Sequence, residues 1–515
     1  MATLLPPPSK KQRTAAAEKS REQQQIETIP PDLGNIRVQF FDQSNGRPTG
    51  APVAVPVADA TVKNLELLLN TLQRNEPSER VPYRFTFQSG DSALDITDDL
   101  YRTLLKPGLK TTEDLVSLQY TPQAIFRVRA VSRCSSSIPG HGEAILATAF
   151  SPSSSSKLLT GSGDGTARLW DTDTGTPIRT LKGHTSWVLV VSWSPDDSTI
   201  ATGSMDNTVR LWVPKTGGAQ GPPLKGHTKW VTSLAWEPYH LQAPNRPRLA
   251  SSSKDSTVRI WDVVSKRIET VLSGHKSSVS CVRWGGTGRI YTASHDKTVK
   301  VWDAAKGTMI HTLSSHAHWV NHLALSTDFV LRTAYHDHTN DIPPTPESKL
   351  QKAKDRFHNA ATINNQIIER LVTASDDYTM YLWEPSTTQK PLSRLHGHQK
   401  PINHVSFSPS AHLIASCGWD NHVKLWSARD GAFIVSLRGH VGPVYMACWS
   451  ADSRFLVSAS KDTTIKVWEV GGKGGGRLKE DLPGHRDEVF AVDWSCDGGR
   501  VASGGKDKAV RVWRH

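Results

Sequence analysis

One spacing recurs along most of the chain and limits the folds that it can adopt. In residues 183–212 (GHTSWVLVVSWSPDDSTIATGSMDNTVRLW) a Gly-His pair opens a unit, and Asp206 stands six residues before a closing Trp212. This Asp-to-Trp spacing occurs eight times, in the pairs Asp164/Trp170, Asp206/Trp212, Asp255/Trp261, Asp296/Trp302, Asp377/Trp383, Asp420/Trp426, Asp462/Trp468 and Asp507/Trp513. A fixed period of this length indicates a repeat architecture in which each unit packs against its neighbours.

A histidine precedes each of these pairs. Seven follow a glycine, and they are His141, His184, His227, His275, His398, His440 and His485. In the fifth unit the pair becomes Ser315-His316. Within a unit, short alternating strands are separated by turn residues, as in VLVVSW, TIATGS and VRLW. The units resemble the WD40 repeat, which implies an all-β, eight-bladed propeller over residues 140–515.

The resemblance implies a structural role for these polar residues. In WD40 repeats the turn aspartate, the Gly-His imidazole, a strand hydroxyl and the tryptophan indole form a buried hydrogen-bonded chain. Buried polar groups need such partners. We therefore interpret the repeat histidines as structural, rather than as metal ligands or catalytic groups.

Composition limits the class of protein further. The net charge is +12, and residues 126–515 alone carry +13. This excess fits either a solvated surface or a patch that faces phosphates. The five cysteines are scattered without a Cys-x-x-Cys pair, which favours free thiols in a reducing compartment. No apolar run long enough to cross a membrane and no apolar secretion signal occurs, so we expect no membrane association.

Residues 1–34 are predicted to be disordered, because they contain few apolar side chains. A short basic cluster, Lys10, Lys11 and Arg13, follows Pro6–Pro8. Such a cluster is compatible with a nuclear import signal, although short basic clusters also arise by chance.

Residues 35–121 are predicted to form a separate small domain. Strands are expected at Asn35–Asp42, Ala51–Val57, Tyr83–Gln88 and Leu115–Tyr120. Leucines spaced along one helical face predict a helix over residues 61–75, with Asp59 or Thr61 as its N-cap. A helical turn is expected near residues 98–105. The order β-β-α-β-β looks like the β-grasp, the ubiquitin-like fold, and predicts an interaction module.

A polar loop enters the last of these strands. It runs from Lys106 through Pro107 and Gly108 to Thr112, Glu113 and Asp114. Loops on a rigid scaffold often carry binding residues. An exposed carboxylate here could pair with an arginine or complete the coordination of a hard cation. A solvated turn without function is the alternative interpretation.

Propeller closure needs a strand from outside the last repeat. The sequence stops two residues after Trp513, at the third strand of the eighth unit, whereas a blade has four strands. The alternating segment 125–131 (IFRVRAV) lies just before the first repeat. We predict that it pairs with the last blade and closes the ring, within a propeller domain that spans residues 122–515.

Two units are longer than the others, and both expand between their first and second strands. The third unit carries residues 237–248, and the fifth carries residues 327–369. Thr345-Pro346 predicts the start of a helix in the fifth-unit insertion. Both insertions are expected on one common face of the propeller. The sequence contains no phosphate-binding loop, zinc-protease motif or nucleophile elbow, so we expect no enzyme.

The small domain and the eight repeats together, with several segments, indicate a family. The segments are PPPSKKQR, DITDDLYRTLLKPG, TTED, IPGHGEAILATAFSP, SHAHWVNHLALSTD, DLPGHRDEVFAVDWS and SGGKDKAVRVW. They closely resemble the Notchless family of assembly factors for the large (60S) ribosomal subunit. The resemblance implies a non-catalytic, monomeric protein of the nucleus and nucleolus, whose propeller docks on rRNA and proteins of the pre-60S particle.

The resemblance also implies a partner for the small domain. Family members are gripped there by the metal-ion-dependent adhesion site (MIDAS) of Midasin, an AAA+ ATPase, and an acidic side chain completes the coordination of the partner's Mg²⁺. The family's ligand lies in an S/T-T-E-D loop, which here is Thr111–Asp114. The resemblance therefore assigns the ligand role to Glu113, flanked by Thr112 and Asp114, with no metal site in this chain. ATP hydrolysis by Midasin would then transmit force for particle remodelling and factor release.

Two other functions remain open from the sequence. One is a WD40 substrate receptor of a ubiquitin ligase, although the repeats read WDTD, WDVV and WDAA rather than W-D-x-[R/K]. The other is a signalling scaffold, for which the sequence offers no membrane-receptor contact.

Overall fold

The structure is a computed structural model, and it divides into two compact units, Met1–Ile125 and Phe126–His515. It describes residues 34–514, except residues 43–46, 74–82, 90–91, 97–98, 107–108, 112, 123–127, 244–245, 338–341, 364–365 and 472–474. No helix among these described residues is long and apolar enough to cross a bilayer. The boundary between the units lies a few residues after the predicted one.

The first unit contains one mixed five-stranded sheet with helical segments. Its strands are β1 (Asn35–Asp42), β2 (Pro48–Pro56), β3 (Tyr83–Ser89), β4 (Ser92–Ile96) and β5 (Leu115–Pro122). Its helical segments are η1 (Val57–Asp59), α2 (Val62–Leu72) and η2 (Tyr101–Leu105). The strand order is β2-β1-β5-β3-β4, and β1 and β5 run parallel at the centre. This order matches the predicted β-grasp topology.

Sequence spacing explains how the helix packs on this sheet. Leu65 and Leu69 are fully buried on the inner side of α2, against strand residues such as Phe40 and Leu118. The Thr61 hydroxyl accepts a hydrogen bond from the Asn64 N–H at 3.4 Å, so Thr61 is the N-cap rather than Asp59. The four predicted strands are present. β4, an edge strand of five residues, was not predicted.

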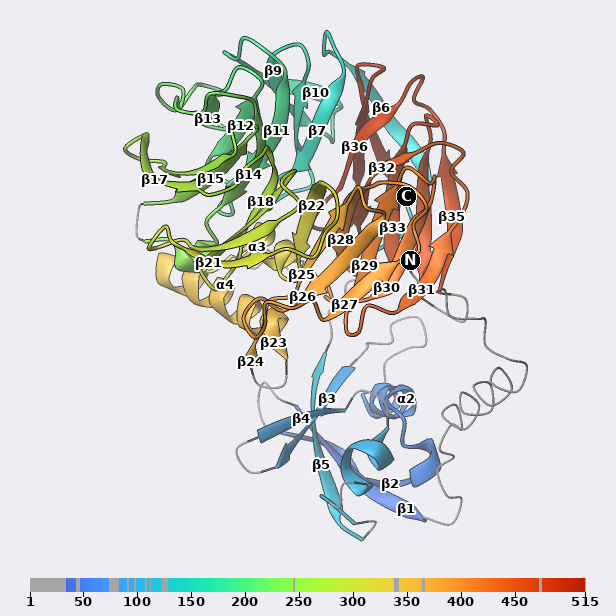
Figure 1. Ribbon diagram of the computed structural model, residues 1–515. Coiled ribbons are helices and arrows are strands. Elements are labelled where there is room, and N and C mark those ends of the chain that lie inside the picture. The colour runs from blue at the N-terminus through green and yellow to red at the C-terminus, as the bar shows by residue number, and fades with distance from the viewer. Residues whose placement is uncertain are drawn as a thin grey trace, which may run out of the picture. The chain divides into compact units, whose positions relative to one another are not determined.

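The second unit contains eight sheets arranged radially (Figure 1). Blade 1 contains β7 (Ile145–Phe150), β8 (Lys157–Ser162), β9 (Thr166–Asp171) and β10 (Thr176–Lys182), and blade 2 contains β11 (Val188–Trp193), β12 (Ile200–Ser204) and β13 (Val209–Trp212). Blade 3 contains β14 (Val231–Trp236), β15 (Arg248–Ser253), β16 (Thr257–Asp262) and β17 (Arg267–Ser273). Blade 4 contains β18 (Val279–Trp284), β19 (Arg289–Ser294), β20 (Val299–Asp303) and β21 (Met309–Leu313).

The last four blades follow the same order. Blade 5 contains β22 (Val320–Leu325), β25 (Leu371–Ser375), β26 (Thr379–Trp383) and β27 (Ser393–His396), and blade 6 contains β28 (Ile402–Phe407), β29 (Leu413–Gly418), β30 (Val423–Ser427) and β31 (Phe433–Leu437). Blade 7 contains β32 (Val444–Trp449), β33 (Phe455–Ser460), β34 (Ile465–Val470) and β35 (Gly476–Leu482). Blade 8 contains β36 (Val489–Trp494), β37 (Val501–Gly505), β38 (Ala509–Arg514) and β6 (Arg133–Pro139). The first strands of neighbouring blades contact each other all the way round and form the innermost ring.

The strand that closes the propeller differs from the predicted one. β6 (Arg133–Pro139) pairs antiparallel with β38 in the last blade, which Figure 1 shows as cyan beside red. The prediction of segment 125–131 was therefore wrong by eight residues. In that segment, Val128 and Val131 instead pack as non-strand residues against a cluster that includes Phe455 and Trp494. β6 was missed because an outermost strand is mostly exposed, and its one buried apolar side chain gives no alternation.

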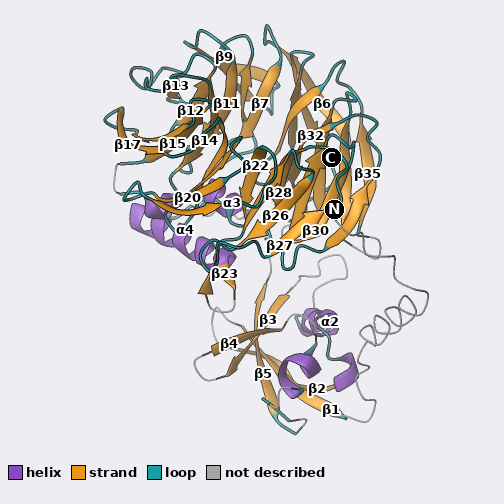
Figure 2. Cartoon of the chain, viewed as in Figure 1, coloured by secondary structure: helices purple, strands orange, loops and turns teal. Residues whose placement is uncertain are grey.

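Both insertions lie, as the sequence predicted, on the propeller face where the first strands end, and they contact each other there. We call this the insertion face. The third-blade insertion contains η3 (Tyr239–Leu241), and the fifth contains α3 (Asp328–Thr333), α4 (Pro346–Ala361), β23 (Thr362–Ile363) and β24 (Gln366–Ile367), with helices in purple in Figure 2. The Tyr239 and Tyr335 ring centroids lie 5.0 Å apart, and His240 stacks on Phe357 at 4.7 Å. Thr345 is the N-cap of α4, as its position before a proline predicts, and it also forms a capping box with Ser348.

Helix α3 ties together blades on opposite sides of the inner ring. Arg332 binds the Asp493 carboxylate of the eighth blade at 2.8 Å through Nη1 and also donates to the Phe150 carbonyl of the first blade. At the other end of α3, Asp328 lies 3.6 Å from Arg283 of the fourth blade. The fifth-blade insertion therefore acts as a brace between blades 1, 4, 5 and 8.

Candidate functional site

The loop before β5 is held by backbone contacts on both sides. The Leu104 carbonyl accepts hydrogen bonds from the N–H groups of Leu109 and Lys110, at 3.0 and 3.2 Å. Leu104 itself is fully buried, so η2 anchors the start of the loop in the core. The loop then leads into β5, which pairs with both β1 and β3 at the centre of the sheet. A side chain in this loop is therefore presented from a rigid base.

The two carboxylates of this loop differ in their surroundings. Asp114 accepts hydrogen bonds from the backbone N–H and the hydroxyl of Thr111, both at 2.9 Å, and these bonds hold the pKa of its carboxyl below the usual value. Glu113 is exposed, and no ion pair or hydrogen bond of its side chain occurs among the described residues. Asp114 thus shapes the turn, whereas the Glu113 carboxylate is open to a partner. Thr112 lies outside the described residues.

The described residues form no metal-binding site of their own. No group of three or more His, Cys, Asp or Glu side chains in it is arranged to hold an ion. A single exposed carboxylate such as Glu113 supplies one oxygen ligand, whereas Mg²⁺ takes six in near-octahedral geometry. This loop can therefore contribute a ligand to an ion held by another protein. The predicted import residues Lys10, Lys11 and Arg13 lie outside the described residues.

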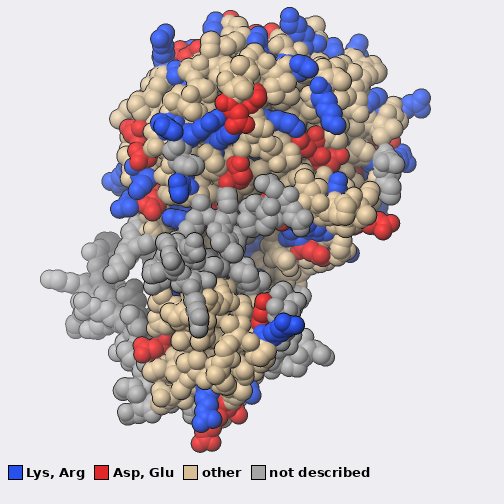
Figure 3. Space-filling model, turned by 180° about the vertical axis from the view of Figure 1, so that it is seen from behind, with Lys and Arg blue, Asp and Glu red and all other residues tan. Residues whose placement is uncertain are grey.

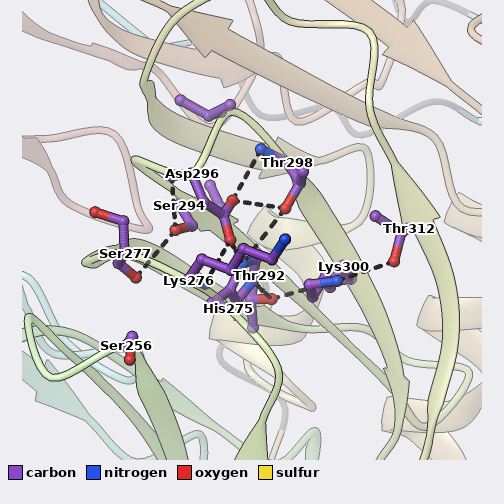
Figure 4. Close-up of polar contacts among 12 residues, drawn as sticks. Ser256, His275, Lys276, Ser277, Thr292, Ser294, Asp296, Thr298, Lys300 and Thr312 are labelled. Carbon is purple, nitrogen blue, oxygen red and sulfur yellow. Dashed lines mark hydrogen bonds and ion pairs between the residues drawn. The ribbon is translucent and has the colours of Figure 1, made fainter.

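Every blade contains the hydrogen-bonded chain expected of its repeat. Figure 4 shows it in the fourth blade, where His275 lies between Asp296 and Thr292. Histidine Nδ1 lies 2.7–2.9 Å from the turn aspartate, histidine Nε2 lies 2.7–2.8 Å from a strand hydroxyl, and the tryptophan Nε1 donates to the same hydroxyl at 2.7–3.0 Å. The hydroxyls belong to Thr160, Thr202, Ser251, Thr292, Thr373, Ser416, Ser458 and Ser503.

The closing tryptophans lie inside the propeller, and none is accessible to a partner. Each is at most 3% exposed, and they are Trp170, Trp212, Trp261, Trp302, Trp383, Trp426, Trp468 and Trp513. Their indoles pack against the preceding blade. For example, one cluster joins Trp468 of the seventh blade to Ala415 and Leu425 of the sixth. The closing tryptophans therefore hold neighbouring blades together and are not part of the candidate binding site.

These chains leave the repeat histidines no free nitrogen for catalysis or metal binding. A carboxylate can only accept, so histidine Nδ1 donates to the aspartate and Nε2 accepts from the hydroxyl. Burial alone would raise the pKa of the turn aspartates, but hydrogen bonds outweigh it. Bonds from Thr166, His141 and backbone N–H groups lower the pKa of Asp164 to about 2, and bonds from His485 and backbone N–H groups lower that of Asp507 to about 2. His316 makes the same bonds although serine replaces the glycine before it.

Two other histidines, His322 and His404, are half-buried on first strands of the inner ring, and they should make stability depend on pH. The His322 and His404 ring centroids are 4.3 Å apart, and His322 Nε2 lies 3.2 Å from an Arg283 nitrogen. Burial, with Arg283 adding to it, lowers the pKa of His322 to about 3, and burial together with His322 lowers that of His404 well below its usual value. Both rings are therefore neutral in the folded protein near neutral pH.

We expect the free energy of unfolding to fall as the pH falls from about 6.5 towards 3. In this window the unfolded chain binds protons on these histidines and the folded chain does not, so each contributes a slope of up to about 1.4 kcal/mol per pH unit. Urea unfolding at several pH values should show a shallower slope for His322→Asn/His404→Asn. The exposed His318→Asn is the control. An unchanged slope in the double variant would contradict a neutral pair.

Three exposed tryptophans form a feature that the sequence analysis missed. Trp187, Trp230 and Trp319 each stand three residues after a repeat histidine, and they are 40–50 % exposed. Their shared position in the repeat could have revealed them, but the tryptophans were interpreted only as the closing residues of the repeats. They lie on the face formed by the loops with the repeat histidines and turn aspartates, which we call the turn face. It is opposite the insertion face.

Basic and acidic side chains are mixed on the surface of the propeller. In Figure 3, Lys and Arg side chains on the visible side of the propeller are interspersed with Asp and Glu side chains. The net charge of +13 of residues 126–515 therefore forms no continuous basic surface patch on that side.

Comparisons with known proteins agree with this architecture. The family described as WD domain, G-beta repeat matches residues 132–171, 175–213, 220–262, 266–303, 389–427, 431–469 and 476–514, and the family described as NLE (NUC135) domain matches residues 36–104. The solved structure of the computationally designed Ika8 protein covers 74% of this chain and 98% of its own, with 27% identity and a TM-score of 0.56. The chain is thus a WD40 propeller protein with an NLE domain.

Whole-chain relatives define the family more narrowly. Ribosome assembly protein 4 of Chaetomium thermophilum is 56% identical over 440 residues, 84% of this chain and 85% of that protein. A Notchless protein homolog of Arabidopsis thaliana is 46% identical over 407 residues, 79% of this chain and 83% of that protein. The chain belongs to the family of Ribosome assembly protein 4 and Notchless.

Proposed function

We propose that this protein is a non-catalytic assembly factor of the large ribosomal subunit that acts in the nucleus and nucleolus. The observation that carries the proposal is the 56% identity to a protein named Ribosome assembly protein 4, over most of both chains. In this proposal the propeller docks on the pre-60S particle, and the import cluster Lys10, Lys11 and Arg13 directs the chain to the nucleus.

The proposal gives the small domain a separate task. Glu113 supplies one oxygen ligand to the Mg²⁺ held by the MIDAS domain of the ATPase Midasin, and ATP-driven pulling on this domain is transmitted to the docked propeller. The exposure of Glu113, the rigid base of its loop and the internal use of Asp114 support this assignment.

We predict that the Glu113→Asp variant still associates with pre-60S particles but no longer binds the ATPase Midasin. Shortening the side chain by one methylene withdraws the carboxylate from an ion that demands strict geometry, although the charge is retained. Tagged variants should be recovered from nuclear extract, and co-purified Midasin should fall at least tenfold. Asp59→Asn, which removes another exposed carboxylate of the same unit, is the control. Midasin recovery equal to wild type would contradict the role of Glu113.

Sedimentation tests the broader function. In a sucrose gradient of nuclear extract, the full chain should migrate with pre-60S particles, for both wild type and Glu113→Asp. Migration with cullins would favour a ubiquitin-ligase receptor, and migration with membranes would favour a signalling scaffold.

A further inference from the structure

A basic hollow lies on the turn face over blades 3 to 5. Its volume is about 480 Å³, and its rim includes Lys229, Lys254, Lys276, His295 and Trp319. Figure 4 shows Lys276, Ser277 and Ser256 beside the fourth-blade chain, at one part of this hollow. The side chains come from the loops before and within consecutive blades, so their spacing is fixed by the propeller itself.

The three lysines are free to bind an anion. All three are exposed, and no carboxylate of the described residues lies within ion-pair distance of their ammonium groups. The acidic group on the rim, Asp255, already accepts hydrogen bonds from His227, the Thr228 N–H and Thr257. Positive charge at this hollow is therefore not neutralised within the part of the chain that the structure describes.

Two aromatic platforms accompany these charges. Trp319 is 47% exposed and stacks on His295 with ring centroids 4.6 Å apart and planes 8° apart. Trp230 is 40% exposed, and the Lys254 ammonium lies 4.3 Å from the centre of its ring. The tilted His318 ring also lies 5.3 Å from Trp319, and both indoles keep at least 40% of their surface exposed. The exposed remainder of each indole is therefore available to stack on a flat ring.

The other side of the turn face is different. At the repeat positions of Lys229 and Trp230, the eighth blade carries Asp487 and Glu488. Two lysines there are paired, since Lys461 lies 3.6 Å from Glu488 and Lys506 lies 3.6 Å from Asp487. The eighth blade thus lacks the unpaired lysines and exposed indoles of blades 3 to 5, and the repeat itself does not require them.

We infer that this hollow binds single-stranded RNA, with phosphates on Lys229, Lys254 and Lys276 and a base stacked on Trp319. Lysine is a point charge suited to phosphate, and every base has a face that an indole can stack on. Free phosphate or an acidic protein would use the lysines but not the indole. This inference rests on the proposed function for the source of the RNA, a single-stranded segment of the pre-60S particle.

The test is binding of the full chain to a fluorescently labelled oligouridine, measured by anisotropy at several salt concentrations. Lys229→Ala/Lys254→Ala/Lys276→Ala should weaken binding at least tenfold and reduce the salt slope by about 2, since each phosphate contact to a single strand contributes about 0.7. Trp319→Ala should weaken binding about tenfold and Trp319→Tyr should restore most of it.

The chain offers a matched control. Lys400, Lys461 and Arg486 occupy the same three repeat positions as Lys229, Lys254 and Lys276, but in blades 6 to 8. Lys400→Ala/Lys461→Ala/Arg486→Ala removes the same charge from the same face and should change binding less than twofold. Equal losses in both triple variants, or equal competition by polyglutamate and unlabelled RNA, would overturn the inference. Pre-60S sedimentation of the same variants separates this outcome from failure of the proposed function.

Discussion

Replacing Asp493 with alanine is expected to lower the free energy of unfolding of the propeller by about 2 to 3 kcal/mol. Asp493 is 3% exposed, and its carboxylate accepts hydrogen bonds from the Phe150 N–H at 2.7 Å and from Arg332 at 2.8 Å. The variant leaves a buried N–H without its acceptor and a guanidinium without its counter-ion. It also releases α3 from the eighth blade, so the brace across the inner ring is lost.

Urea unfolding of the full chain measures this loss. The control is Glu469→Ala, which breaks a 2.9 Å ion pair with the exposed Arg477 and should cost less than about 1 kcal/mol. If both variants shifted the unfolding midpoint equally, the α3 brace would contribute nothing beyond an ordinary surface pair.

Thr292→Val is expected to lower the free energy of unfolding by a similar amount, about 3 kcal/mol. The Thr292 hydroxyl bonds His275 Nε2 at 2.8 Å and accepts from the Trp302 indole at 2.9 Å. Valine has the same shape but no hydroxyl, so two buried polar groups lose their partner at about 1–3 kcal/mol each.

The repeats themselves supply the control for this variant. Blades 3, 6, 7 and 8 use serine at the position of Thr292, and each makes the same two bonds. Thr292→Ser should therefore cost less than about 1 kcal/mol in the same unfolding measurement. A serine variant as unstable as the valine variant would show that packing of the methyl group, rather than the hydrogen-bonded chain, stabilises the blade.

The parts of the fold that could be predicted share one property, which is that they repeat or alternate. The Asp-to-Trp spacing locates all eight buried chains, and the leucine spacing of α2 locates its buried face. β6 could not be located because an outer strand with a single buried side chain, Ile138, shows no pattern. The α3 brace could not be predicted either, since the Arg332–Asp493 pair spans 161 residues with no local signal.

The candidate site could likewise be predicted only in part from the sequence. The sequence and family resemblance direct attention to the Thr111–Asp114 loop, but spacing alone does not distinguish its two acids. The structure separates them, because Asp114 closes the turn onto Thr111 and Glu113 faces solvent. The hollow on the turn face was missed because its lysines and tryptophan come from three blades, which lie side by side only in the folded propeller.

Calorimetric titration of the full chain with an isolated Midasin MIDAS domain, in Mg²⁺ and in EDTA, tests the central claim most directly. Wild type, Glu113→Ala and the control Asp59→Asn would be measured side by side. The proposed mechanism predicts binding by wild type and by the control only when Mg²⁺ is present, and no binding by Glu113→Ala in either buffer. Binding that persists in EDTA or without Glu113 would contradict a metal-bridged tether, and the small domain would then be an ordinary protein-docking surface.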